Sequence, residues 1–132
     1  MIRQTAITDA LKEHLASMPE RPATIWENEH AEPSGTAYLT VASVRAEPFG
    51  LTLDGMGHDY TGFLMVNVVT PSGTGTRAAY DLAERIAAHF YGAQIPVDGG
   101  QLRINRQPQI MDGYQDGARY RIPVNVRYRL IA

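Results

Sequence analysis

The residues able to do chemistry are scattered along the chain and do not show the spacing of a known site. No two histidines lie three or four residues apart, so no helical face is expected to carry a pair of imidazole ligands. Asp54, His58 and Asp59 share one stretch and could bind a metal, although the glycines beside them indicate only a turn. The serines lack the context of a nucleophile elbow. The sequence therefore predicts no catalytic residue, no metal site and no cofactor.

One glycine-rich turn, residues 71–76, lies where a predicted strand passes into a predicted helix. Backbone N–H groups and the helix dipole can bind phosphate at such a point. The turn lacks the lysine of a Walker loop and the third glycine of a dinucleotide-binding loop. We interpret it as a structural helix start, with Thr74 or Thr76 as the cap. A small cytosolic ligand-binding domain or enzyme that uses the helix start between Gly73 and Thr76 stays open as an alternative.

Hydrophobic periodicity predicts the elements that must position these residues. Apolar residues recur at helical spacing in 2–17 and 76–90, and strand patterns occupy 23–27, 36–45, 60–70, 101–108 and 118–131. We predict one α+β domain over residues 1–132, in the order α-β-β-β-α-β-β. Its mostly antiparallel sheet of about five strands carries two main helices packed on it.

The last predicted strand alternates strictly between apolar and polar residues, so one face is buried and the other is polar. Its polar face carries Arg119, Arg121, Arg127 and Arg129. Arg103, Asn105 and Gln107 would join them if the two strands pair across the Asp-Gly turn. Such a face is either simply solvated or a protein–protein interface, and the lack of interleaved aromatics disfavours nucleic acid.

Two features indicate assembly. The connection 46–59 is long for a compact domain, and we expect it to become ordered on assembly. Its candidate assembly residues are Phe49, Leu51, Leu53, Met56 and His58. In addition, Pro123 interrupts the last strand, which predicts either an edge position or a bulge there.

Composition limits the class of protein. The chain has 132 residues, 12 basic and 14 acidic side chains and a net charge of -2, which disfavours a general polyanion binder. No apolar run approaches the ~18 residues of a membrane span, and no cysteine is present. The charges are uneven: residues 1–60 hold nine acids and four bases (-5), whereas residues 61–132 hold five acids and eight bases (+3).

Short motifs spread over nearly the whole chain carry a family resemblance through their order and spacing. They are Ile25-Trp26-Glu27-Asn28, Pro33, Gly35, Tyr38-Leu39, Gly62-Phe63-Leu64-Met65-Val66-Asn67-Val68, Pro71, Gly73, Gly75, Ala83, Ile86, Ala87, Phe90, Asp116-Gly117, Tyr120-Arg121-Ile122-Pro123-Val124 and Arg127-Tyr128. In these the chain resembles the tail terminators of long-tailed bacteriophages, in the group similar to the lambda U protein.

The resemblance implies a structural protein of the virion tail or neck, made in the cytoplasm of a bacterial host, with no cofactor and no catalysis. Such proteins form a homo-oligomeric ring, usually a hexamer, on the last ring of the tail tube. The ring stops tube growth and presents the surface that joins the head. The implied partners are further copies of the chain, the tail tube protein and the head–tail connector protein, with no membrane and no specific nucleic acid. Another neck protein, such as a connector or stopper, is the alternative within the virion.

The uneven charge suggests how copies would join. We expect a head-to-tail contact between the arginine face of one subunit and an acidic surface from the N-terminal half of the next. The clustered Glu27, Glu29 and Glu32 are the expected acidic partners.

Overall fold

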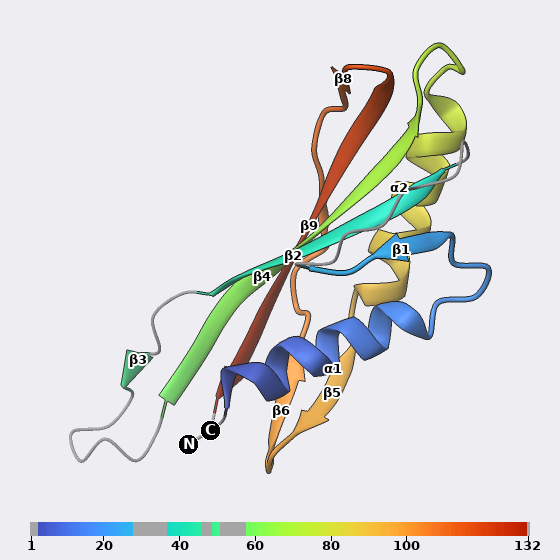
Figure 1. The fold of residues 1–132 in the computed structure, drawn as a ribbon. Helices are drawn as coiled ribbons and strands as arrows, with labels where there is room; N and C mark the ends of the chain where they lie inside the picture. Colours follow the sequence, from blue (N-terminus) through green and yellow to red (C-terminus); the bar gives the residue numbers. More distant parts are fainter. Residues whose placement is uncertain (1–2, 28–36, 46–48, 51–57, 132) are drawn as a thin grey trace.

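The protein is described by a computed structural model that covers residues 3–27, 37–45, 49–50 and 58–131 (Figure 1). Its helices are α1 (Gln4–Ala16) and α2 (Arg77–Phe90). Its strands in these ranges are β1 (Ala23–Ile25), β2 (Tyr38–Arg45), β3 (Phe49–Gly50), β4 (His58–Pro71), β5 (Gln94–Val97), β6 (Gly100–Arg103), β7 (Gln109–Ile110), β8 (Tyr114–Asp116) and β9 (Arg119–Ile131). The predicted α+β class, with two helices on a mostly antiparallel sheet, is confirmed.

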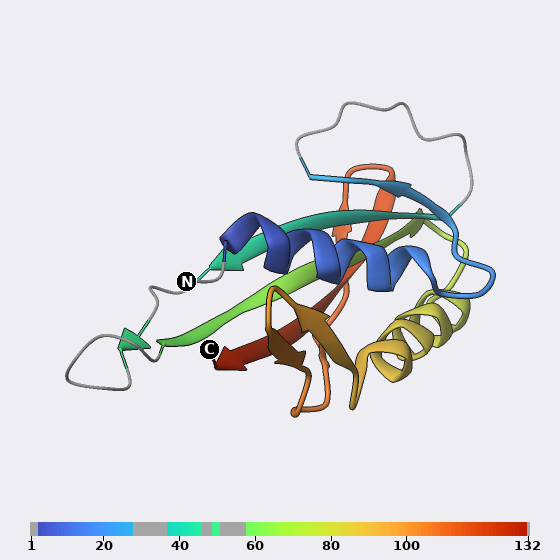
Figure 2. The same ribbon diagram turned by 90° about the horizontal axis from the view of Figure 1, so that it is seen from below.

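The sheet is built around two long antiparallel strands, β4 and β9, which pair along their whole lengths from Asp59 opposite Ile131 to Pro71 opposite Arg119. The strand order is β1-β2-β4-β9-β6-β5, with β3 added to β4, and β7 and β8 added to β9. The pairing of β1 with β2 is parallel, unlike the others in the described sheet. Both helices lie over one side of the sheet (Figures 1 and 2).

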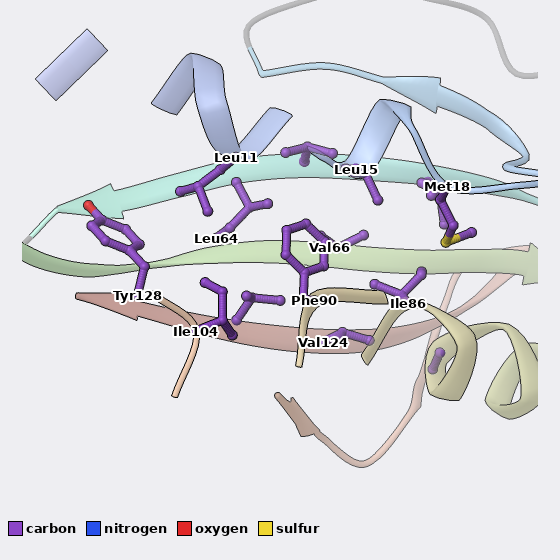
Figure 3. Close-up of a cluster of buried hydrophobic side chains, with 14 of the residues drawn as sticks. Leu11, Leu15, Met18, Leu64, Val66, Ile86, Phe90, Ile104, Val124 and Tyr128 are labelled. Atoms are coloured by element: carbon purple, nitrogen blue, oxygen red, sulfur yellow. The ribbon is translucent and has the colours of Figure 1, made fainter. Parts of the chain in front are cut away.

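The core lies between the helices and the inward faces of β2, β4, β6 and β9 (Figure 3). Every second residue of β9 points inward, from Ile122 to Leu130, as the alternation predicts. The stripe of α2 predicted from the sequence, from Ala79 to Phe90, is buried against them. Phe90 is fully buried and labelled near the middle of the cluster in Figure 3.

The prediction of about five strands was too low. The five predicted strands are present, but β3, β5, β7 and β8 were missed. Segments of two to four residues carry little periodicity, and the equally short β1 and β6 were found only as parts of longer predicted stretches. The predicted strand at 101–108 is shorter than expected, ending at Arg103.

The predicted threonine cap of α2 was wrong. Thr76 occupies the cap position without a side-chain hydrogen bond, whereas the Thr74 hydroxyl donates to the Pro71 carbonyl oxygen at 2.9 Å. Gly92, just past the end of the helix, has a φ of 77°, the left-handed conformation that is common at this position.

Pro123 does not lie on an edge strand, because β4 flanks β9 on one side and β6, β7 and β8 flank it on the other. The Pro123 carbonyl accepts a hydrogen bond from the Met111 N–H at 2.9 Å, so its own nitrogen faces the same neighbour. There β7 has ended at Ile110 and β8 begins at Tyr114, which leaves an interruption in the ladder. The proline is accommodated because its partner strand is broken, and the expected edge position is wrong.

The two helices are joined at their last turns by His14 and His89. Each ring donates from Nε2 to the other residue's backbone carbonyl, at 2.8 Å and 2.6 Å, and the rings stack with centroids 4.3 Å apart. A helix end leaves its last carbonyls without partners in the next turn of helix, and the His89 carbonyl is one of these. The His14 carbonyl also accepts from the Ser17 hydroxyl at 2.6 Å. Sequence spacing could not reveal the histidine pair, because 75 residues separate its members.

Replacing His14 with alanine is expected to lower the free energy of unfolding by about 2 kcal/mol. The hydrogen bond from its ring to the His89 carbonyl and the stacking of the two rings are lost, whereas the backbone carbonyl of residue 14 can still accept from His89. Urea denaturation of the parent and the variant measures this difference. Glu13→Ala, an exposed substitution in the same turn, is the control and should change stability by less than about 0.5 kcal/mol. Equal midpoints for the two variants would contradict the bridging role.

Candidate assembly interface

The alternation of β9 places the four predicted arginines on the side of the sheet turned away from the helices. We call this side, formed by β2, β4 and β9, the open face. The four arginines do not share one environment, because they are spread over the length of a strand of 13 residues.

At the start of β9, two of the four arginines are held within the chain. The guanidinium of Arg119 lies 5.5 Å from the ring centre of Tyr38, within the range of a cation–π contact. The Arg121 Nε donates to Asp116 at 2.6 Å across the hairpin of β8 and β9. Because these contacts occupy both guanidinium groups, this end of the open face offers less free charge than the sequence suggested.

At the other end of β9, Arg129 and Arg127 differ. Arg129 donates to Asp59 from Nε at 3.0 Å and from Nη2 at 2.7 Å, a forked contact with one carboxylate. These hydrogen bonds raise the pKa of Arg129, and the negative charge of Asp59 raises it further by a smaller amount. Arg127 is exposed, lies opposite Phe63 and makes no ion pair with any residue that the structure describes.

Arg103 joins the arginines by another route than the predicted one. It pairs directly opposite Arg129 because β6 aligns with the end of β9. The Asp116-Gly117 turn instead connects β8 to β9. Asn105 lies in the same neighbourhood, whereas Gln107 does not line it.

A surface groove of about 470 Å³ lies where β4, β6 and β9 meet. Its lining includes Phe63, Arg103, Asn105, Arg106, Arg127 and Arg129. Arg106 was not among the predicted residues, because alternation along the predicted strand 101–108 puts it on the face opposite to Arg103. In the structure β6 ends at Arg103, so that alternation does not extend to Arg106. Only the tertiary structure brings it beside the two arginines of β9.

The predicted acidic partners are only partly described. The Glu27 carboxylate accepts hydrogen bonds from the Ser43 N–H at 3.1 Å and the Ser43 hydroxyl at 2.8 Å, so it is engaged along the edge of β2. Glu29 and Glu32 lie outside the described residues.

The predicted assembly segment, 46–59, contains a short hairpin that the sequence did not reveal. Phe49 pairs opposite Asp59, and Gly50 pairs opposite His58. Leu51, Leu53 and Met56 lie outside the described residues.

The alternative ligand site, the turn from Gly73 to Thr76, is exposed and reaches α2 through two glycines with φ of 86° and 81°. In the described part of the chain no three His, Asp or Glu side chains gather as metal ligands. Over the same residues, no helix is long and apolar enough to cross a membrane.

A family model for the phage tail terminator protein matches residues 6–128. The chain therefore belongs to the phage tail terminator family, and the resemblance identified from its motifs is confirmed. It is a structural protein of the phage virion and not an enzyme, so the alternative based on the turn before α2 is set aside.

Solved structures share this fold. One, of a protein without a descriptive name, is 23% identical, with a TM-score of 0.77, and the match covers 98% of this chain and 96% of that one. Another belongs to the virion of a native gene transfer agent particle, at 15% identity and a TM-score of 0.72, covering 97% and 96% of the two chains. No protein with curated annotation matches the chain.

Proposed function

We propose that this protein is the subunit of a ring, usually a hexamer, that caps the tail tube, stops its growth and presents the surface that joins the head. The observation that carries the proposal is the match of the tail terminator family to residues 6–128, nearly the whole chain. Its partners are further copies of itself, the tail tube protein and the head–tail connector protein.

The contact between neighbouring subunits is proposed to run head to tail, with Arg119, Arg121, Arg127 and Arg129 facing the acidic residues of the next copy. Support comes from the exposure of Arg127 and from the open face on which it lies. Because Glu27 is already bonded to Ser43, the acidic contribution falls mainly to Glu29 and Glu32. Exposed ion pairs are worth ~0–1 kcal/mol each, so they orient the subunits while apolar contacts supply most of the affinity.

Electron microscopy of the purified protein, alone and mixed with its tail tube protein, tests the function. We expect closed rings of uniform size, and tubes that end in an added ring when the protein is present during polymerisation. The length distribution of the tubes is the quantitative measurement. Tubes that grow to the same length with and without the protein would contradict the capping role.

A further inference from the structure

Four guanidinium groups gather around the groove between β4, β6 and β9 with little charge to balance them. Arg103 lies directly opposite Arg129 in the paired strands, an arrangement of like charges that destabilises a sheet. Arg106 and Arg127 complete the cluster. Among the described residues, the carboxylate that pairs with this cluster is that of Asp59, which is held by Arg129. Arg103 Nη2 donates to the neutral side-chain oxygen of Gln101 at 3.2 Å.

The groove also has an apolar component. Phe63 lines the groove and lies opposite Val44 of β2. The Val44 side chain is 46% exposed. The Asn105 amide adds a donor and an acceptor at the rim. The volume of about 470 Å³ falls within the usual range of ~300–1,000 Å³ for small-ligand sites. A smaller hollow of about 330 Å³ shares the side chains of Arg103, Asn105 and Arg129.

We propose that this groove binds an extended acidic segment of a partner protein, in which an apolar side chain stands between carboxylates. Guanidinium groups bind carboxylates through paired hydrogen bonds, and Phe63 would receive the apolar side chain. The net charge of -2 disfavours a long, uniformly charged polyanion, whereas a short acidic segment meets only the local cluster. Nucleic acid is for these reasons the weaker candidate.

This inference rests on the proposed function and extends it. Arg127 serves the contact between subunits, whereas Arg103, Arg106 and Phe63 receive the segment of the partner protein. The test of this inference uses the purified protein and a synthetic peptide, so it can fail while rings still form. Conversely, the groove can bind the peptide even if no ring assembles, which keeps the two failures distinguishable.

The probe is a blocked five-residue peptide with leucine between two pairs of glutamates, and titration calorimetry measures its binding at low and high salt. Two further peptides replace the glutamates with glutamines, or the leucine with glycine. The groove variant is Arg103→Gln, Arg106→Gln, which removes two exposed charges outside the predicted arginine face of β9. The matched control is Lys12→Gln, Arg77→Gln, which removes two charges from the helices. Circular dichroism and the melting temperature confirm that both variants fold.

We expect the groove variant to bind the acidic peptide at least about tenfold more weakly than the parent, because charged hydrogen bonds are lost, while the control binds as the parent does. The glutamine and glycine peptides should both bind more weakly than the probe. Equal binding by groove variant and control would overturn the proposal, as would tighter binding of a single-stranded oligothymidylate. A groove variant that loses self-association but keeps the peptide would assign the site to a second copy, and would also overturn it.

Discussion

Glutamate in place of Arg127 is expected to abolish ring assembly and to leave the subunit folded. Arg127 is exposed and forms no ion pair with the described residues, so reversing its charge breaks no ion pair among them. In a closed ring the same unfavourable pairing repeats at every subunit contact. We expect each contact to weaken by about tenfold, enough to lose the ring at concentrations where the parent assembles. Light scattering at low and high salt measures the assembled mass.

The structure also selects the controls for this experiment. Arg77→Glu makes the same charge change at an exposed position of α2 and should leave assembly unchanged. Arg129 is unsuitable for reversal, because its replacement would leave Asp59 without its partner. Restoration should be sought with Glu29→Arg and Glu32→Arg, since Glu27 is bonded to Ser43. Parent-like assembly of the Arg127 variant at both salts would show that the charged contact is wrong.

Alanine in place of Gly62 is expected to lower the free energy of unfolding by about 3 kcal/mol or more. A methyl group at this position would overlap the backbone carbonyl oxygen of Val44 in β2 and would lie 2.5 Å from the hydroxyl of Tyr128 in β9. The tyrosine can shift, but the carbonyl belongs to a paired strand, so β2 and β4 would have to separate. Urea denaturation provides the measurement.

A second glycine separates this collision from simple backbone strain. Gly73 has a φ of 86°, and a methyl group there would meet nothing within 4 Å. Gly73→Ala should therefore cost only about 1–2 kcal/mol, the cost of holding alanine in a left-handed conformation. If Gly62→Ala lowers the free energy of unfolding no more than Gly73→Ala does, the proposed collision at Gly62 is wrong.

Local patterns in the sequence were sufficient to predict the longer helices and strands, in which the hydrophobic period repeats several times. The helical spacing of Leu11, Leu15, Ile86 and Phe90 determined which sides of α1 and α2 are buried. The strict alternation of β9 determined that its arginines face away from the core. Both patterns report burial along one continuous segment, which is why they could be read without knowing the partner segments. The family motifs were likewise recognised from their order and spacing along the chain.

The tertiary structure alone decided the features that join distant segments. It gave β1 a parallel partner, interrupted the ladder beside Pro123 and brought His14 to His89. It also divided the arginine face, because Asp116 and Asp59 engage two of its members while Arg103 and Arg106 join the exposed end. The physical reason is that periodicity gives the direction of a side chain relative to its own strand or helix, whereas its charge partners depend on which strands pair and in which register.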